Sequence, residues 1–510
     1  MATIRILGID QGTSGTRATL VDEDGRVLAH AYRGHVQHCP RPGWVEHDAA
    51  EIWRNTCAVI EEAVARAAVT RVDALAIANP GETVLLFDRD TGQPLHHALV
   101  WQDLRVQPDM ERRARDKSVA RKVAEITGLR LDAYFSAGKI RWLLDNVPAA
   151  APLLAQCRLG IATIDAFLIH RLTGGRSFVT DASTAARTLL FDIRANRYDP
   201  WLLELFGVPL EALPDVRDSV GDFGTVSRLS DAIADPIADA IAGTPILVGL
   251  VDQPAAMIGH ACLDEGDIKA TYGTGCFVYR NTGERPRPSR QGLLGTIAWR
   301  REGKTTYALD GGVFAAGSVL SWLRDGLGLG DTSAALNALA SSTADTEGVV
   351  CVPALAGLAA PHWDRSARAA WLGMTLATTR AHLVRAAFEG IAARVAQVVG
   401  AMEADSGLDV TRLRVDGGLT ESSVLMQMQA DLLGVPIEVS VEPEATVMGV
   451  CYLALTALSC WRDHTEIRER VAARDAAARV YEPSIGRAER EERLARFARA
   501  IVLTRGWGSE

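Results

Sequence analysis

The feature that most constrains this chain is a series of strand-like and helix-like segments that occurs twice. Three apolar runs, "IRILGI", "RATLVD" and "VLAHAY", open the chain; a helix-like stretch from Ala49 to Ala67 and two more runs, "VDALAIA" and "TVLLFD", follow. From about residue 245 a similar series runs through "TPILVGL", "DIKATYG", "CFVYRNT", "GLLGTIAWR" and "TTYALDG" to the helix-like "AAGSVLSWLRDGL". Strand triplets followed by a helix and another strand indicate a mixed sheet covered by helices. The sequence therefore predicts an α/β protein in two halves.

The length of 510 residues is too great for one hydrophobic core, so we expect two large domains, residues 1–251 and 252–510. The first contains a mainly helical, loop-rich insertion at about 103–230, and the second ends in a helix within "RAEREERLARFARAIVLTRG". No low-complexity linker separates the halves. Domains joined in this way usually hinge about a shared cleft, where we expect the functional site.

Charge and composition exclude several classes of partner. Lysine and arginine total 54 against 63 acidic residues, a net charge of -9, which argues against nucleic acid and anionic membranes as partners. No apolar run approaches the roughly 20 residues that cross a bilayer. The start "MATIRILGID" lacks the pattern of a signal peptide, so we expect a cytoplasmic protein. The eight cysteines form no C-x-x-C pair and are interpreted as reduced packing residues, Cys276 included.

The loop "GIDQGTSGTR", residues 8–17, follows the first strand-like run. Small residues let backbone N–H groups approach an anion, and Thr13 and Ser14 add hydroxyl donors. Arg17 could meet an outer phosphate oxygen, and Asp10 would hold Mg²⁺ through water. Such clusters are first of all hairpin turns, but a second loop, "TYGTGCF", follows a strand in the other half. One loop in each half is what a cleft gripping phosphates from two sides requires.

Two more segments carry functional signals. The Gly-rich turn "RVDGGLTESS", residues 414–423, lies where backbone can pack against a nucleotide base or ribose, or is a plain strand-to-helix turn. Asp252 ends the apolar run "PILVGLV", where an ionised carboxylate is costly unless it is compensated or chemically used. In the cleft it could take the proton of a substrate hydroxyl that attacks the γ-phosphorus of ATP; a helix N-cap is the structural alternative, and both can hold.

These motifs, together with "PGWVEHD", "YFSAGKIRWLLDN", "DASTAARTLLFDI", "APHWDRSARAAWLGMT" and "LRVDGGL", identify the chain as similar to the FGGY carbohydrate kinases over nearly its whole length. Within the family it is most similar to the glycerol kinases. The resemblance implies two actin-like, ribonuclease-H-like ATPase domains that close on ATP, Mg²⁺ and a small polyol, and a homo-oligomer, a dimer or tetramer.

The resemblance also implies roles for individual residues. Asp252 matches the catalytic base, and Asp10 the residue linked to Mg²⁺. Nucleotide contacts are implied for Thr13, Ser14, Arg17, Thr274, Gly317, Ser321, Gly418 and Ser422, the serines at 321 and 422 standing where glycerol kinases usually have Gln and Asn. Substrate contacts are implied for Gly81, Glu82, Trp101, Tyr134, Asp252, Gln253 and Phe277. An aromatic wall can hold the carbon skeleton while carboxylate and amide groups recognise hydroxyls.

One position departs from the glycerol kinases, which have an arginine where this chain has Gly81, in "NPGET". Losing a charge-assisted donor costs on the order of 1.5 to 3 kcal/mol of ligand interaction and opens space. We therefore expect a polyol longer than glycerol, a four- or five-carbon alditol. The alternative is that Arg105 or Arg187 fills the gap.

Other functions remain open from the sequence. Glycerol kinase proper and a ketopentose kinase, acting on xylulose or ribulose, are alternatives within the class, since pockets in the family vary around a constant phosphate machinery. A non-catalytic actin-like nucleotide switch is an alternative from another class. That alternative predicts loss of the catalytic base, yet both Asp10 and Asp252 are present.

Overall fold

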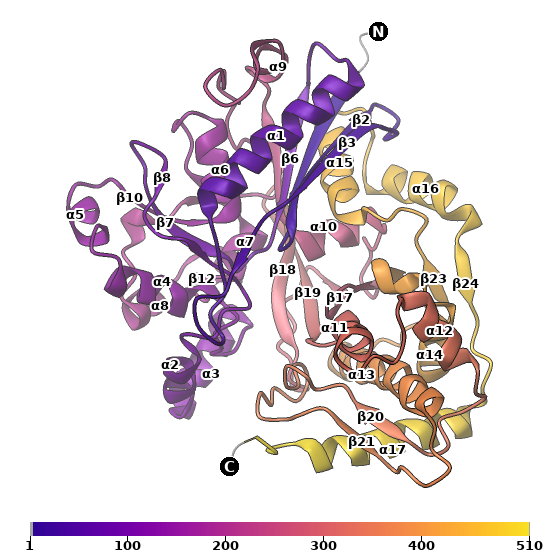
Figure 1. Cartoon of the computed structure of the whole chain (residues 1–510). Coiled ribbons are helices and arrows are strands. Elements are labelled where there is room, and N and C mark those ends of the chain that lie inside the picture. Colours follow the sequence, from indigo (N-terminus) through magenta and orange to yellow (C-terminus); the bar gives the residue numbers. More distant parts are fainter. Residues whose placement is uncertain (1–3, 509–510) are drawn as a thin grey trace.

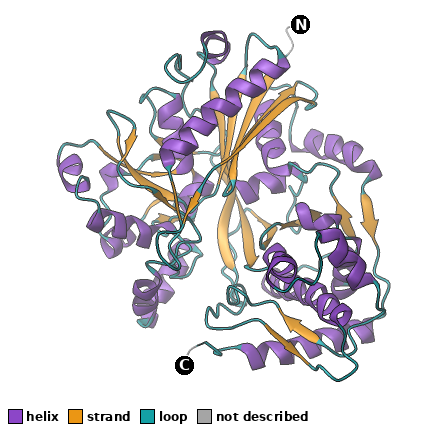
Figure 2. Cartoon of the chain, viewed as in Figure 1, coloured by secondary structure: helices purple, strands orange, loops and turns teal. Residues whose placement is uncertain are grey.

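The structure, a computed structural model, describes residues 4–508. Two lobes, each built on a mixed β-sheet with helices against it, meet along a central boundary (Figures 1 and 2). The N-terminal half of the chain forms one lobe, and most of the C-terminal half forms the other. The helix that ends the chain, α17 (Arg487–Thr504), lies along the outer edge of the second lobe.

The first lobe is built on a five-stranded sheet in the order β15-β6-β1-β2-β3. Strands β1 (Arg5–Gln11), β2 (Gly15–Asp22) and β3 (Val27–Gly34) form an antiparallel meander, and β6 (Ala74–Asn79) and β15 (Ile246–Val251) add in parallel to β1. Helix α1 (Ala49–Ala67), which coincides with the expected helix, packs on β2 and β3. Its N-terminus is capped by the carboxylate of Asp48, which accepts from the N–H of Ala50 at 2.8 Å.

A second, smaller sheet lies beside the first in the same lobe. The expected strand "TVLLFD" is β7 (Val84–Asp88), and it pairs here, with β10 (Leu159–Thr163) and β9 (Ala98–Leu99), instead of joining the first sheet. The other strands of this sheet are β4 (Gln37–His38), β5 (Glu46–His47) and β8 (Gln93–Pro94).

Seven helices and two short strand pairs occupy the region where the sequence predicts an insertion. The helices are α2 (Gln107–Ala114), α3 (Lys117–Thr127), α4 (Ser136–Asn146), α5 (Ala150–Ala155), α6 (Ile164–Leu172), α7 (Ala182–Ala186) and α8 (Pro200–Phe206). The strand pairs are β11 (Val179–Asp181) with β14 (Asp215–Arg217), and β12 (Phe191–Asp192) with β13 (Arg197–Tyr198). Helix α9 (Asp235–Ile241) follows, next to α1.

The second lobe is built on a seven-stranded sheet in the order β18-β19-β17-β16-β22-β23-β24. Its strands are β16 (Ile268–Tyr272), β17 (Cys276–Gly283), β18 (Leu294–Arg301), β19 (Lys304–Val313), β22 (Leu413–Asp416), β23 (Ile437–Val439) and β24 (Arg479–Tyr481). The helices around it are α11 (Gly317–Ser321), α12 (Ser333–Ser341), α13 (Arg380–Ser406) and α14 (Ser423–Leu433). A strand pair, β20 (Val350–Val352) with β21 (Ala370–Leu372), packs between α13 and α17.

The two main sheets share a common strand arrangement. In each, three neighbouring antiparallel strands (β3-β2-β1, and β19-β17-β16) are extended by two parallel strands (β6 and β15, and β22 and β23). In the second sheet the chain passes through the edge strand β18 between β17 and β19. The turn between β1 and β2 is therefore the counterpart of the turn between β16 and β17. These turns are the two predicted phosphate-gripping loops.

Two segments lie in a different lobe from the one that their position in the sequence suggests. The strand "TPILVGL", which opens the second series in the sequence, is β15 of the first sheet. Helix α15 (Ala445–Ala457) returns from the C-terminal half to pack against β1, β6 and α10 (Asp252–Gly259), while α16 (His464–Arg474) follows it. Residues from both halves thus share one core. The predicted domain boundary between residues 251 and 252 stays a prediction.

No helix within residues 4–508 combines the length and the apolar character that a membrane span requires. The cytoplasmic location expected from the sequence stays a prediction.

Candidate active site

The predicted base lies between the lobes. Asp252 is the first residue of α10, directly after β15, and its Oδ1 accepts from the N–H of Gln253 at 2.6 Å. Burial raises the pKa of Asp252 to about 7; Glu82 and Asp10 of the first lobe raise the pKa further, and Lys269 of the second lobe lowers it. A carboxylate with this proton affinity can both accept and release a proton near neutral pH.

The loop between β1 and β2 is held by hydrogen bonds from Trp101 and His35 to Thr13. The Nε1–H of Trp101 donates to Oγ1 of Thr13 at 2.9 Å, and Nε2 of His35 lies 2.8 Å from the Thr13 carbonyl oxygen. The next residue, Ser14, is exposed. The hairpin is closed by a hydrogen bond from Gly12 N–H to the Gly15 carbonyl at 2.9 Å. The loop therefore presents small residues on a backbone that is already held in place.

Asp10 and Arg17 face each other across β1 and β2. Burial raises the pKa of Asp10 to about 6, although Arg17 opposes the shift. Arg17 also forms an ion pair with Glu444, next to α15, and lies 5.4 Å from the ring of Tyr32. The arginine predicted to meet a phosphate thus already has carboxylate neighbours, with which an incoming phosphate would compete.

The loop between β16 and β17 is packed against the start of α11. The carbonyl of Thr274 accepts from the N–H groups of Ala316 and Ser318 at 3.0 and 3.1 Å. A Cβ on Gly317 would lie 2.6 Å from the Gly273 carbonyl oxygen, so only glycine allows this close approach. Thr274 is exposed. Ser321, which ends α11 one helical turn after Gly317, is also exposed. Thr274 and Gly317 are therefore neighbours, and their contacts with a nucleotide stay a prediction.

The third Gly-rich turn connects β22 to α14. Gly417 has a φ of 92°, and a Cβ there would lie 2.4 Å from the Tyr272 carbonyl. A Cβ on Gly418 would meet nothing within 4 Å, so backbone is open to a ligand at this point. Ser422 instead caps α14 by accepting from Leu425 N–H at 3.1 Å, and its hydroxyl donates to Asn337. Its capping role is structural, and its nucleotide contact stays a prediction.

Three aromatic residues predicted to contact the substrate, Trp101, Tyr134 and Phe277, pack together as an aromatic wall. The ring of Trp101 lies 5.5 Å from that of Tyr134 and 5.8 Å from that of Phe277, edge to face in both cases. Phe277 belongs to β17 of the second lobe and the other two to the first. The predicted substrate residues therefore come together from both lobes, and Trp101 links this wall to the phosphate loop through Thr13.

The space expected to open beside Gly81 is filled. A Cβ on Gly81 would lie 2.7 Å from Cγ of Arg187 and 2.9 Å from Cγ2 of Val251. The Nε–H of Arg187 donates to Oε1 of Glu82 at 2.6 Å, and its Nη2–H donates to Oδ2 of Asp310 at 2.9 Å. The expectation that Gly81 leaves room was therefore wrong, because the stem of another arginine occupies it.

The other arginine considered for this gap, Arg105, is paired with carboxylates away from Gly81. Its guanidinium pairs with Asp103 at 2.8 Å and Glu46 at 2.7 Å, and it lies between the rings of Trp44 and Trp142. Arg187 alone of the two predicted alternatives reaches Gly81.

Sequence reasoning missed a buried lysine. Lys269 on β16 donates from Nζ to Oγ1 of Thr271 at 2.8 Å and to the side chain of Gln253. Burial lowers its pKa, while Asp416 and Asp252 raise it. Asp416 in turn lies 2.9 Å from Nε2 of His260. A lysine inside the apolar run "DIKATYG" was the available signal, because lysine is almost never fully buried unless it is paired.

The donor set fits Mg²⁺. Asp10 and Asp252 are buried carboxylates with raised pKa values, and the charge of Asp10 acts on Asp252, so a divalent cation near them would relieve their repulsion. Within residues 4–508 no group of three or more His, Cys, Asp or Glu side chains forms a metal cage. Mg²⁺ is usually held by one or two carboxylates together with substrate phosphates, which is the arrangement available here.

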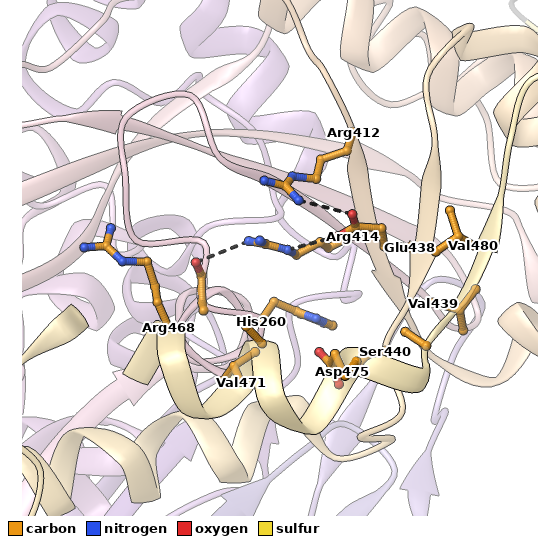
Figure 3. A pocket seen from close by; sticks show the side chains of 14 residues that line it. His260, Arg412, Arg414, Glu438, Val439, Ser440, Arg468, Val471, Asp475 and Val480 are labelled. Atoms are coloured by element: carbon orange, nitrogen blue, oxygen red, sulfur yellow. Dashed lines mark hydrogen bonds and ion pairs between the residues drawn. The ribbon is translucent and has the colours of Figure 1, made fainter. Parts of the chain in front are cut away.

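A separate cavity of about 370 Å³ lies between α16 and the β22–β24 edge of the sheet (Figure 3). Its arginines are paired with acids: Arg412 and Arg414 lie 3.2 and 3.5 Å from the carboxylate of Glu438, and Arg468 pairs with Asp264. None of the site residues predicted from the sequence lines it. The cavity is therefore distinct from the candidate active site.

Comparison with known proteins places both halves in one family. Residues 5–259 match the N-terminal domain of the FGGY family of carbohydrate kinases, and residues 268–458 match its C-terminal domain. The chain is 45% identical over 507 residues to a glycerol kinase of Alkalilimnicola ehrlichii, covering 99% of both chains. It is 42% identical over 506 residues to a glycerol kinase of Deinococcus radiodurans, covering 98% of both.

Solved structures agree with this similarity. The glycerol kinase of Plasmodium falciparum, crystallised with ADP, superposes with a TM-score of 0.90 at 33% identity over 98% of both chains. The xylulose kinase of Rhodospirillum rubrum gives a TM-score of 0.81 at 25% identity, also over 98% of both. The predicted fold class, α/β with two actin-like (ribonuclease-H-like) domains, is confirmed.

Proposed function

The chain belongs to the FGGY family of carbohydrate kinases, and on this premise we propose that it transfers the γ-phosphoryl group of ATP to a terminal hydroxyl of a small polyol. The observation that carries the proposal is the position of Asp252. Its buried carboxylate is influenced by the charges of Asp10 and Glu82 from the first lobe and of Lys269 from the second. The Plasmodium relative was solved with ADP, which supports a nucleotide in the cleft.

Asp252 acts as the general base. The terminal hydroxyl of the polyol donates its proton to the Asp252 carboxylate while its oxygen attacks the γ-phosphorus and ADP leaves. The raised pKa of Asp252 suits this role, since a base with a proton affinity near the working pH accepts a proton most effectively. A positioned base contributes roughly 100- to 10,000-fold to the rate.

The phosphates lie between the paired loops. Thr13 and Ser14 from the first lobe and Thr274 from the second supply hydroxyl and backbone donors, and Gly317 and Gly418 allow the nucleotide to approach the backbone. Asp10 would hold Mg²⁺ through water together with the phosphates, and the ion would neutralise charge on the transferred group. Arg17 exchanges part of its interaction with Glu444 for a phosphate oxygen.

The substrate is a neutral molecule rich in hydroxyl groups. Glu82, Asp252 and Asp310 place three carboxylates on the substrate side, opposed mainly by Arg187 and Lys269, so a sugar acid would be repelled. Trp101, Tyr134 and Phe277 pack against the carbon chain. We propose a four- or five-carbon alditol, because no side chain at position 81 donates to the short glycerol molecule.

Glycerol itself is the second candidate. It is favoured by Arg187, which keeps a guanidinium next to Glu82, and by relatives at 42 to 45% identity that are glycerol kinases. A ketopentose kinase is the third, since the fold is shared with xylulose kinases.

The test is a coupled ATPase assay over glycerol, erythritol, threitol, ribitol, xylitol, D-xylulose, D-ribulose and gluconate. We expect polyol-dependent turnover, the highest kcat/KM for a four- or five-carbon alditol, and none for gluconate. The highest kcat/KM for glycerol would overturn the chain length, and the highest for a ketose would overturn the substrate class. ATP binding without turnover on any member would favour the nucleotide switch. The proposed homo-oligomer is tested by light scattering on the same preparation.

A further inference from the structure

We propose that Arg187, the residue after α7, is a positioning residue of the acceptor site that holds the Glu82 carboxylate in place. The proposal rests on the function proposed above, which supplies the acceptor. It assigns to Arg187 the fixing of the Glu82 carboxylate, and to Gly81 the provision of room for Arg187.

The steric relation between the two positions is the first observation. A Cβ added to Gly81 would lie 2.7 Å from Cγ of Arg187 and 3.1 Å from Cβ of Arg187. Both distances are shorter than those between packed carbon atoms. Arg187 is only 1% exposed and follows α7 directly, so its stem has no open space into which to move. A side chain at position 81 and the observed conformation of Arg187 therefore exclude each other.

The hydrogen bonds of the guanidinium are the second observation. Its Nε–H bonds to Oε1 of Glu82 at 2.6 Å, in the first lobe, and its Nη2–H to Oδ2 of Asp310 at 2.9 Å, on β19 of the second lobe. The ring of Tyr134, in the aromatic wall, is centred 5.5 Å from Cζ. The carboxylates and the neighbouring tyrosines raise the pKa of Arg187 well above its ordinary value, although burial opposes them. The cation is thus permanently charged.

An unused donor of Arg187 is the third observation. Among residues 4–508, the buried Nη1 of Arg187 has no acceptor. The Nε–H of Arg187 bonds to Oε1 of Glu82 and so orients this carboxylate, and the proposal assigns Oε2 to a substrate hydroxyl. Because a carboxylate only accepts, the group it selects is a donor, a hydroxyl. Arg187 acts on the substrate through Glu82, as an orienting partner.

Five variants test this role: Gly81→Ala, Arg187→Lys, the single variants Arg187→Ala and Gly81→Arg, and the swap that combines the last two. Gly81→Ala adds a methyl group that makes no hydrogen bond but collides with the Arg187 stem. Arg187→Lys keeps the charge and loses the fork that bonds two carboxylates. The swap Gly81→Arg with Arg187→Ala moves an arginine to the position that glycerol kinases use. The matched control is Gly400→Ala in α13, where a Cβ meets nothing within 4 Å.

We expect Gly81→Ala and Arg187→Lys to raise the KM for the acceptor about 10- to 100-fold, the range for a lost charge-assisted hydrogen bond. The kcat and the KM for ATP stay within about threefold of wild type, because Asp252 and the phosphate loops are untouched. The swap recovers most of the KM lost in Arg187→Ala, whereas Gly81→Arg alone is worse than wild type.

An unchanged acceptor KM in folded Gly81→Ala and Arg187→Lys, checked by circular dichroism, would overturn the proposal. If Arg187→Lys does not fold, the acceptor KM values of Gly81→Ala and of the swap test the proposal instead. The KM is measured on whichever member of the panel the wild type phosphorylates best. A wild type that prefers a ketose refutes the proposed polyol, while the KM shift on that ketose still decides the role of Arg187.

Discussion

The proposed acceptor side and the proposed nucleotide side differ in how their residues are held. On the proposed acceptor side, Glu82 and Asp310 are buried, and both are paired with the buried Arg187. On the proposed nucleotide side, Thr274 and Gly418 are exposed, and the close contacts there are made by backbone.

The difference follows from what each side has to recognise. A phosphate presents the same oxygens in every nucleotide, so backbone N–H groups on small-residue turns suffice to bind it. Hydroxyls of a particular polyol differ in number and direction, and only side chains held by their neighbours can distinguish them. Substitutions on the acceptor side should therefore change the acceptor KM selectively, and those on the nucleotide side the KM for ATP.

The largest effect is expected at the residue that serves both sides. Asp252→Asn removes the base and should lower kcat about 100- to 10,000-fold with little change in either KM. It should also raise the melting temperature. The folded-state pKa of Asp252 is about 7, above its ordinary 3.8, so ionising this buried group costs stability that accumulates as pH rises from about 4 to 7.

The gain in melting temperature of Asp252→Asn is therefore expected to be larger at pH 8 than at pH 5, by differential scanning fluorimetry. Turnover close to wild type in this variant would remove Asp252 from the mechanism.

Asp310→Asn tests the proposed acceptor side through its residue from the second lobe. It leaves Arg187 with one carboxylate partner, and we expect the acceptor KM to rise about tenfold, the effect of one charge-assisted hydrogen bond. The KM for ATP should not change, as measured in the coupled assay with each substrate varied in turn. Equal shifts in both KM values would show that the two sides are not independent.

Gly317→Ala is the mirror-image test on the nucleotide side. Its methyl would lie 2.6 Å from the Gly273 carbonyl oxygen and displace the loop that carries Thr274. We expect the KM for ATP to rise roughly tenfold, about 1.4 kcal/mol of nucleotide binding, with the acceptor KM unchanged. A selective effect on the acceptor would reverse the assignment of the two sides.

The pH dependence of kcat/KM for the acceptor should report Asp252. Because its pKa is raised to about 7, the carboxylate is protonated and inactive as a base at lower pH, so the rate falls on the acid side. Between pH 7 and pH 6 the expected decrease is about fivefold, close to the limit of tenfold per unit for one ionising group. A rate that is flat down to pH 5 would place the essential ionisation elsewhere.

The smallest effect is expected outside the cleft. Arg412 in the separate cavity is half exposed and forms a single pair with Glu438, so Arg412→Ala should change neither KM by more than about twofold. A selective change in one KM would instead connect this cavity to that side of the cleft.

Much of this architecture could be predicted from sequence, because the signals were local. The turns at "GTSGT" and "TYGTG" and the helix from Ala49 to Ala67 depend on neighbours a few residues apart. The sequence could not predict which sheet β15 and β7 join. Apolar runs such as "TPILVGL" and "TVLLFD" can pair in either sheet, and only contacts with strands far away in the sequence select one of the two sheets.

By itself, the sequence determined the family and the two-lobed α/β fold, since motif, spacing and apolar periodicity are properties of short segments. Only the tertiary structure decided what Gly81 means. From the sequence, the glycine indicated a lost donor and an open space; in the fold, an arginine 106 positions further along the chain occupies that space and bonds Glu82 and Asp310. Packing between distant segments is a property of the whole fold, which no local pattern records.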